Sequence, residues 1–258
     1  MRVIAGSARG VPLKGPPSAA TRATLDKVRG AIFDALVLYL DDARVLDLYA
    51  GTGALGIEAL SRSAASCLFV ERAAPACRVV EANLRTARLA EGGRVWRATV
   101  ETALDRLEAT LAPAHVPVPV PAPDGPAIVV ADTVAPAEAA ITDAGDAGDA
   151  GDDRATRPRS RAQYSSNSRG QGAPLPPGFG PPYDIILLDP AYDDPGIAGV
   201  IERVSRACFV APGGFIVLEH GKRVRPPHAP GDVRPFRARL YGDTAVTIWR
   251  RDDGEAEV

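Results

Sequence analysis

A glycine-rich turn between an apolar segment and a helical pattern constrains this chain more than any other feature. Residues 45–48 are short and apolar, as a buried strand would be, and residues 55–61 are typical of a helix. The sequence that connects them is Asp47-Leu48-Tyr49-Ala50-Gly51-Thr52-Gly53-Ala54-Leu55-Gly56. Glycines at such a junction let the backbone turn tightly and pass close to a ligand. The pattern predicts an α/β protein with a ligand site after its first parallel strand.

Strand-like and helix-like segments alternate along the rest of the chain. Strands are predicted at residues 2–4, 45–48, 67–70, 95–98, 183–188 and 215–218, and helices at 25–39, 55–61, 75–88 and 197–208. Such alternation indicates a mostly parallel sheet that helices cover on both faces. Residues 233–240 and 245–249 flank Tyr241-Gly242-Asp243, which predicts an antiparallel hairpin at the sheet edge.

Residues 112–182 differ in composition from both flanks. They contain alternating prolines, an Ala-Gly-Asp repeat at 144–152, arginines at 154, 157, 159 and 161, and a Ser/Asn/Gly/Gln stretch. This composition cannot offset its own ordering entropy, so we expect a disordered insertion, with a short strand at 127–130 as the less favoured alternative. The predicted organisation is an N-terminal extension at 1–40, an α/β domain formed by 41–111 and 183–251, and a tail at 252–258.

Composition excludes several classes of protein. With 258 residues, 46% of them hydrophobic, the chain can bury a full core, and its net charge of -2 predicts no partner by itself. The three cysteines form no CxxC pair, so we expect buried free thiols and neither disulfides nor a metal site. No apolar run approaches the ~20 residues of a membrane helix, and the first residues lack a signal-peptide pattern. We expect a cytoplasmic protein without a membrane partner.

The ligand of the glycine-rich turn is predicted from two carboxylates. Glu71 ends the next strand, 20 residues after Gly51, where it can accept hydrogen bonds from ribose hydroxyls. The glycines also match the GxGxxG pattern of NAD(P)-dependent oxidoreductases, but Asp47 would place negative charge beside a pyrophosphate. The ammonium end of S-adenosylmethionine suits that position better, and we predict this cofactor. The expected cofactor-binding residues are Asp47, Tyr49, Ala50, Gly51, Thr52, Gly53, Gly56, Glu71, Arg72, Thr99 and Val100.

A second loop, Asp189-Pro190-Ala191-Tyr192, follows the apolar strand at 183–188. The exocyclic amine of a nucleic-acid base is a poor nucleophile because its lone pair is delocalised, so an enzyme must hold and orient it. Asp189 and the carbonyl of Pro190 can accept hydrogen bonds from its two N–H groups, and Tyr192 can stack on the base. An isolated Asp-Pro pair would be an ordinary turn, but beside a matching cofactor loop we interpret these residues as catalytic.

The loop resembles the Asp-Pro-Pro-Tyr/Phe motif of DNA and RNA amino-methyltransferases, and the chain is similar to bacterial 16S rRNA guanine-N2 methyltransferases. The similarity lies in residues 2–6, 9–10, 13–14, 21–24, 26–29 with Phe33, and 241–244, and it covers nearly all of the chain except the insertion. It implies the class I S-adenosylmethionine-dependent methyltransferase fold, an α/β Rossmann-like sheet of seven mostly parallel strands with an antiparallel C-terminal hairpin.

The resemblance also implies a substrate, the N2 amine of a specific guanine in 16S rRNA, within a partly or fully assembled small ribosomal subunit, and a monomeric enzyme. Through residue 36 the chain has six basic and two acidic residues, a candidate RNA-binding surface. A solvated helix face would explain Lys27 and Arg29 equally well. The expected phosphate contacts are Arg9, Lys14, Arg22, Lys27 and Arg29.

Three departures from the family pattern leave other functions open. Ala191 replaces the second proline of the motif, Gly30 stands in a helix where a glutamate is usual, and Thr99 replaces the acidic or amide residue that meets adenine. The alternatives are a DNA adenine-N6 methyltransferase, an NAD(P)-dependent oxidoreductase and a non-catalytic RNA-binding relative. His220 follows Glu219 at a strand end, but amine methylation requires no histidine base.

Overall fold

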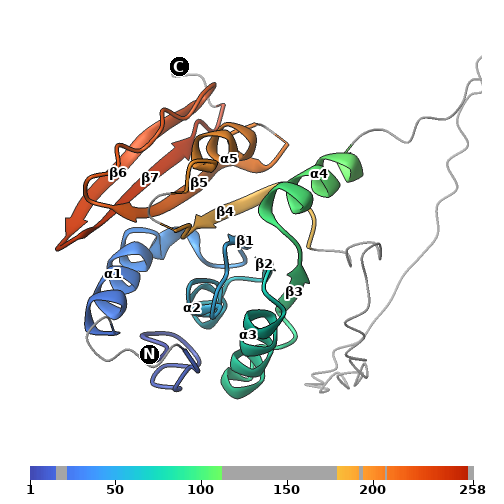
Figure 1. The fold of residues 1–258 in the computed structure, drawn as a ribbon, viewed down its shortest axis with the longest axis vertical. Coiled ribbons are helices and arrows are strands. Elements are labelled where there is room, and N and C mark those ends of the chain that lie inside the picture. Colours follow the sequence, from blue (N-terminus) through green and yellow to red (C-terminus); the bar gives the residue numbers. More distant parts are fainter. Residues whose placement is uncertain (16–21, 112–178, 192–193, 207, 255–258) are drawn as a thin grey trace, which may run out of the picture. The chain divides into compact units, whose positions relative to one another are not determined.

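The computed structural model describes residues 1–15, 22–111, 179–191, 194–206 and 208–254 (Figure 1). Of the expected insertion only residues 179–182 belong to this part, and the possible strand at 127–130 lies outside it. Tyr192 and the last four residues of the tail also lie outside it. Within the described ranges no helix has the length and apolarity to cross a membrane.

One sheet of seven strands organises the described chain, in the order β3-β2-β1-β4-β5-β7-β6. Within this order β3, β2, β1, β4 and β5 are parallel to one another, whereas β7 runs antiparallel to both β5 and β6. The predicted fold, including its antiparallel C-terminal hairpin, is confirmed. The strands are β1 (Arg44–Leu48), β2 (Ser66–Glu71), β3 (Gly93–Arg97), β4 (Tyr183–Leu188), β5 (Val210–Gly221), β6 (Val233–Tyr241) and β7 (Thr244–Arg251).

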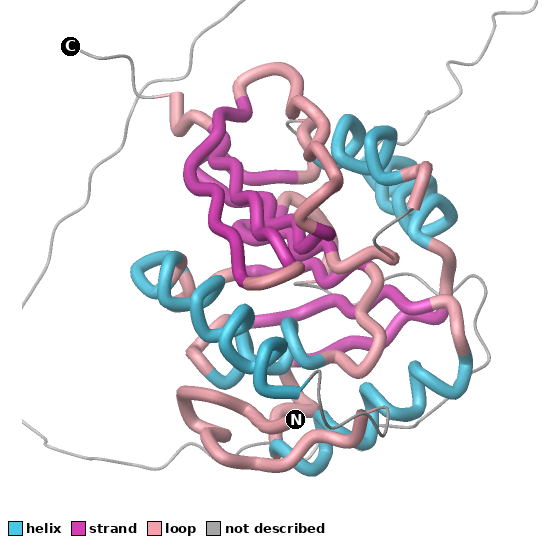
Figure 2. Tube along the Cα trace, turned by 60° about the vertical axis from the view of Figure 1, so that its left-hand side comes forward, coloured by secondary structure: helices cyan, strands magenta, loops and turns pink. Residues whose placement is uncertain are grey.

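Helices cover both faces of this sheet (Figures 1 and 2). One face packs against α1 (Arg22–Ala35), α2 (Ala54–Ser61) and α3 (Ala74–Ala87), and the other against α4 (Val100–Leu111) and α5 (Ile197–Val204). Each face of the sheet forms a hydrophobic core with its helices, and β4 contributes to both. Ile185 and Leu187 pack in the first core, and Ile186 and Leu188 pack in the second. A strand buried on both faces needs an uninterrupted apolar sequence, as β4 has.

Several elements differ from the sequence-based expectation. Residues 2–4 form only one antiparallel bridge, Arg2 to Pro12, and a short 3-10 helix (Val37–Tyr39) follows α1. The helix expected at 197–208 ends at Val204, and β5 is longer than predicted. Helix α4 was not predicted, although its buried residues Val100, Ala103, Leu104 and Leu107 have helical spacing.

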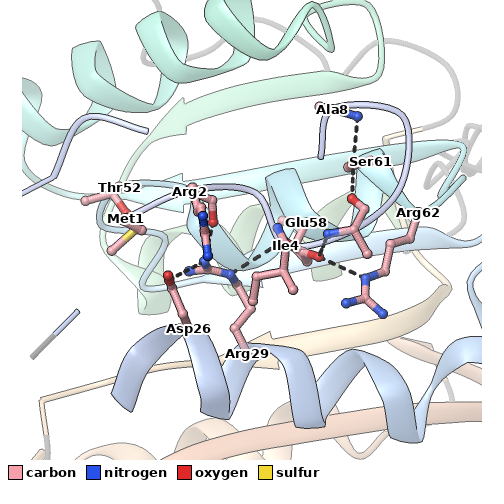
Figure 3. Close-up of polar contacts among 12 residues, drawn as sticks. Met1, Arg2, Ile4, Ala8, Asp26, Arg29, Thr52, Glu58, Ser61 and Arg62 are labelled. Carbon is pink, nitrogen blue, oxygen red and sulfur yellow. Dashed lines mark hydrogen bonds and ion pairs between the residues drawn. The ribbon is translucent and has the colours of Figure 1, made fainter. Parts of the chain in front are cut away.

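A fully buried carboxylate explains why the N-terminal segment is not part of the sheet (Figure 3). Glu58 of α2 accepts hydrogen bonds from the backbone N–H groups of Ile4 (2.8 Å) and Ala5 (2.9 Å). It also forms ion pairs with Arg62 (2.9 Å) and Arg29 (3.6 Å). Buried charges are tolerated when they are paired in this way, so one side chain binds the N-terminal segment, α1 and α2 together.

The end of α2 holds the same segment by close backbone contact. The Ser61 hydroxyl donates to the Ala5 carbonyl at 2.6 Å and accepts from the Ala8 N–H at 2.9 Å. Gly6 (φ +81°) passes so near that a Cβ would lie 1.8 Å from the Ser61 carbonyl oxygen. Only glycine fits at this position, because a side chain would force the segment away from α2.

Removing the Glu58 carboxylate should destabilise the protein strongly. In Glu58→Ala, the part-buried N–H groups of Ile4 and Ala5 lose their acceptor, and Arg29 and Arg62 each lose one of their two acidic partners. The free energy of unfolding, measured in urea, should fall by about 3–5 kcal/mol. The control Asp34→Asn removes only an exposed partner of Arg62 and should cost less than about 1 kcal/mol. Equal losses in the two variants would contradict a structural role for Glu58.

Candidate active site

The glycine-rich loop connects the carboxyl end of β1 to α2, beside β4, where the strand order reverses. Open α/β sheets bind ligands at this switch point. A Cβ on Gly56 would lie 2.4 Å from Phe69, and one on Gly53 would lie 2.8 Å from Val80, so both glycines are required by packing. A Cβ on Gly51 (φ +54°) would meet one atom within 4 Å, at 3.8 Å. Gly51 therefore leaves room on the outer side of the loop for a ligand.

Glu71 holds this loop from the end of β2. Its Oε2 accepts a hydrogen bond from the Gly51 N–H at 3.0 Å, and its Oε1 accepts one from the Ala73 N–H at 2.7 Å. The side chain is half-buried, and each carboxylate oxygen keeps a second lone pair. The residue thus fixes Gly51 and retains acceptors for ribose hydroxyls.

Asp47 lies beneath the loop and not beside its outer surface. It is 1% exposed, and its Oδ2 accepts a hydrogen bond from the Gly56 N–H at 3.0 Å. The pKa of Asp47 is raised from 3.8 to about 8, mainly by burial and also by the carboxylates of Asp189 and Glu71, while the Gly56 hydrogen bond lowers it. Sequence analysis expected Asp47 close to the ligand. In the structure its carboxylate instead holds the backbone of the glycine-rich loop at Gly56.

Tyr49 and Ala50 begin the loop in unusual surroundings. Tyr49 has a left-handed backbone (φ +63°), which is strained for a residue with a bulky side chain and recurs at functional sites. Its buried hydroxyl has no hydrogen-bond partner within the described ranges, and burial followed by the Asp194 carboxylate raises its pKa. The Ala50 N–H donates to the Val70 carbonyl at 3.0 Å, which ties the loop to β2.

The remaining cofactor candidates lie at the start of α4 and after β2. The Thr99 hydroxyl accepts a hydrogen bond from the Thr102 N–H at 3.2 Å and so caps α4. Val100 is 6% exposed and packs in the core, so only its backbone can meet a ligand. Arg72 is exposed next to Glu71. Thr99 and Val100 therefore have structural roles that the sequence did not indicate.

The Asp189 loop lies on the neighbouring strand, at the same edge of the sheet. Asp189 is half-buried, Pro190 is buried and Ala191 is exposed. Within the described residues the Asp189 carboxylate makes no hydrogen bond, and burial raises its pKa well above 3.8. The Ala191 carbonyl accepts from the Asp194 N–H at 3.0 Å, so the loop turns without a second proline. The expected stacking by Tyr192 stays a prediction, because Tyr192 lies outside the described ranges.

Glu219 of β5 is a site residue that sequence analysis did not assign. It is 5% exposed and lies next to Asp189, because both follow the paired residues Leu188 of β4 and Leu218 of β5. Burial, and then the Asp189 charge, raise the pKa of Glu219, whereas Arg29 lowers it. A signal was available in the sequence, since Glu219 directly follows the apolar residues 215–218 as Glu71 follows the apolar residues 67–70. Near it, His220 has a structural role, with its ring nitrogens against the Gly221 carbonyl (3.1 Å) and the Thr247 hydroxyl (3.0 Å).

Asn83 of α3 joins the N-terminal segment to the glycine-rich loop. Its side-chain amide donates to the carbonyls of Lys14 (3.0 Å) and Thr52 (2.9 Å), and its Oδ1 accepts from the Lys14 N–H at 2.8 Å. The Thr52 hydroxyl also lies 3.6 Å from the Met1 sulfur. Asn83 is 1% exposed, and no sequence pattern marks it. The described N-terminal residues are therefore neighbours of the candidate site.

The basic residues of the N-terminal region separate into two groups. Arg9, Lys14 and Lys27 are exposed, as an RNA contact requires, and the side chain of Arg22 is outside the described part. Arg29 is only 3% exposed and donates to the Arg2 carbonyl (2.6 Å) and to Asp26 (2.8 Å), in addition to its ion pair with Glu58. The expectation that Arg29 contacts RNA is corrected, because this guanidinium is enclosed by protein partners.

The carboxylates at this edge are not arranged around a metal ion. Within the described ranges no three histidine, cysteine, aspartate or glutamate side chains are close enough to bind one. The site instead offers acceptors for hydrogen-bond donors and a negative environment for a cation.

Solved structures of other proteins share this fold. The structure of yhhF from Escherichia coli superposes with a TM-score of 0.62, 22% identity and coverage of 98% of both chains. The structure of HI0767 from Haemophilus influenzae superposes with a TM-score of 0.57 and 20% identity, and the match covers 97% of this chain and 98% of that one. The structure of SMU.776 complexed with SAH superposes with a TM-score of 0.52 and 10% identity, and the match covers 88% of this chain and 49% of that one.

The chain belongs to the family described as Conserved hypothetical protein 95, whose model matches residues 1–116 and 157–250. YlbH of Bacillus subtilis, named as a candidate rRNA methyltransferase, is 29% identical over 97% of this chain and 99% of its own length. Ribosomal RNA small subunit methyltransferase D of Escherichia coli is 46% identical over 71 residues, which are 28% of this chain and 36% of that protein. The family resemblance seen in the sequence is confirmed.

The raised pKa of Asp47 predicts how stability depends on pH. Between pH 3.8 and about 8 the unfolded chain has lost this proton while the folded protein retains it. Stability is therefore greatest below the lower value and falls as pH rises through about 8, by up to about 1.4 kcal/mol per pKa unit. Asp47→Asn removes this titration and keeps an oxygen that can accept from Gly56.

Melting temperatures between pH 5 and pH 9 should fall less steeply for Asp47→Asn than for the native chain. Asp105→Asn, at an exposed carboxylate of α4, is the matched control and should keep the native slope. An unchanged slope in Asp47→Asn would show that the carboxyl group of Asp47 is not the titrating group.

Proposed function

We propose that this protein transfers a methyl group from S-adenosylmethionine to the N2 amine of a specific guanine in 16S rRNA, within a partly or fully assembled small ribosomal subunit. The observation that supports it most is the Asp189 carboxylate, which makes no hydrogen bond within the described residues, at the switch point of the sheet beside the glycine-rich loop. The rRNA substrate rests on the family, in which relatives are named for methylation of ribosomal RNA.

The residues at the loop fit S-adenosylmethionine better than a dinucleotide. Gly51 leaves space for a ligand, and Glu71 retains acceptors suited to ribose hydroxyls. Glu71 and Asp189 place carboxylates at this edge, and negative charge there opposes a pyrophosphate and favours a cation. When bound, S-adenosylmethionine supplies a methyl group on a positively charged sulfonium. We therefore disfavour the oxidoreductase alternative.

In the proposed mechanism Asp189 and Pro190 orient the target amine. The Asp189 carboxylate accepts a hydrogen bond from one N–H of the amine, and the Pro190 carbonyl accepts one from the other. The nitrogen lone pair would thereby be directed at the methyl carbon, and the new N–C bond would form as the methyl–sulfur bond breaks and leaves its electron pair on sulfur. The amine then loses one proton, which an Asp189 oxygen can take up because burial raises the pKa of this residue. Tyr192 is proposed to stack on the base.

Replacing Asp189 tests the reaction directly. In Asp189→Ala the amine loses its charged acceptor, so methyl transfer to small ribosomal subunits that lack the modification should fall at least about 100-fold. Binding of labelled S-adenosylmethionine should stay within about threefold of native, because Asp189 orients the amine and not the cofactor. Loss of both activities would contradict the assigned role, and transfer by the native enzyme to bare DNA alone would favour the adenine-N6 alternative.

The exposed N-terminal cations are proposed to bind RNA phosphates. Replacing Arg9 and Lys14 together with glutamine should lower RNA affinity for all sequences and reduce the slope of log K against log salt by roughly two. Arg206→Gln, just after α5 on the other face of the sheet, removes an exposed cation as the control and should leave the slope unchanged. An unchanged slope in the double variant would exclude this surface.

A further inference from the structure

The pairing of β4 with β5 places Glu219 beside Asp189. Leu188 of β4 pairs with Leu218 of β5, so the next residue of each strand stands at the same level, on strands about 4.8 Å apart. Val217 and Leu187 precede them by two residues and pack in the same core, so both carboxylates project from the same face. The two acceptors are therefore neighbours at the carboxyl edge.

The carboxylate of Glu219 has no structural partner. It is 5% exposed, yet it makes no hydrogen bond or salt bridge with any residue in the described ranges. The charge of Arg29 lowers the pKa of Glu219, but the Arg29 guanidinium contacts Glu58, Asp26 and the Arg2 carbonyl. A buried carboxylate without a partner costs stability, and such costs persist where a ligand uses the group.

We propose that Glu219 is a specificity-determining residue that accepts a hydrogen bond from the N1–H of the target guanine while Asp189 holds the N2 amine. The inference rests on the proposed function and extends it to the choice of base. It assigns the two neighbouring acceptors to the two neighbouring donors on the Watson–Crick edge of guanine.

The chemistry of the bases explains the discrimination. Guanine, adenine and cytosine all have an exocyclic amine, but only guanine presents a ring N–H donor next to it. Adenine and cytosine present a ring nitrogen acceptor at that position, whose lone pair would face the Glu219 carboxylate. An acceptor placed against an acceptor leaves both groups unpaired, which makes this kind of discrimination strong.

The burial of both carboxylates agrees with this assignment. Without RNA, burial and mutual repulsion raise the pKa of Glu219, so its ionised form is disfavoured. Donors from a bound guanine would stabilise the ionised forms of both acids. Removing the Glu219 charge should therefore stabilise the free protein while weakening the reaction, whereas removal of a structural residue lowers both.

Two variants test the proposal. The control is Glu202→Gln, at an exposed glutamate of α5. The first test variant, Glu219→Gln, keeps the shape and a neutral acceptor. The second, Glu219→Leu, removes every side-chain acceptor at similar volume. With small ribosomal subunits as substrate, kcat/KM should fall by about 10-fold in the first and about 100-fold in the second. The melting temperature should rise in both, and binding of S-adenosylmethionine should stay native.

A base analogue provides a readout that a structural role would not change. After the native enzyme has been used to map the methylated nucleotide, 2-aminopurine, which has the same amine but no N1–H, is placed there by ligation. The native enzyme should prefer guanine to 2-aminopurine by about 100-fold, and Glu219→Leu by only a few-fold.

Native specificity in Glu219→Leu, or lowered melting temperature together with lost cofactor binding in both variants, would overturn the proposal. Failure of the native enzyme to methylate rRNA would instead refute the proposed function.

Discussion

The parallel register of β1, β4 and β5 is the constraint on which the candidate site depends. It brings the carboxyl ends of these strands to one edge and directs Asp47, Asp189 and Glu219 to one face of the sheet. Glu71 joins them from β2, and its hydrogen bond fixes Gly51. Because the strands are buried on both faces, these carboxylates lie at the boundary of the hydrophobic core. Burial there raises the pKa of Asp47, Asp189 and Glu219. The same architecture therefore produces the acceptors and their altered acidity.

The N-terminal segment is tied to this edge by two buried polar side chains. Glu58 and Asn83 bind backbone groups of residues 4, 5 and 14, and Asn83 also binds the carbonyl of Thr52 in the glycine-rich loop. Each satisfies several donors or acceptors at once, which is the condition for burying polar groups without a large cost. The surface proposed for RNA and the loop proposed for the cofactor are thus linked by hydrogen bonds through Asn83.

Sequence reasoning succeeded where local periodicity carries the information. The glycine-rich loop, the Glu71 position and the C-terminal hairpin follow from apolar strands and turn residues that need no distant partner. Arg29 was misjudged because its partners, Glu58 and the Arg2 carbonyl, are distant in sequence, and burial cannot be deduced from a basic residue on a helix. Glu219 and Asn83 act through neighbours that only the assembled sheet and helices bring near. Thr99 stays a predicted cofactor contact, and its capping of α4 was not foreseen from the sequence.

The pH dependence of single-turnover methyl transfer tests most directly the claim that buried carboxylates hold the target base. Asp189 must be ionised to accept from the amine, and burial raises its pKa. Its charge in turn raises the pKa of the neighbouring Asp47 and Glu219. The rate should therefore rise between pH 5 and pH 8, and the midpoint should move to lower pH in Glu219→Leu, where the neighbouring charge is gone. A rate that is constant across this range in both proteins would contradict the account.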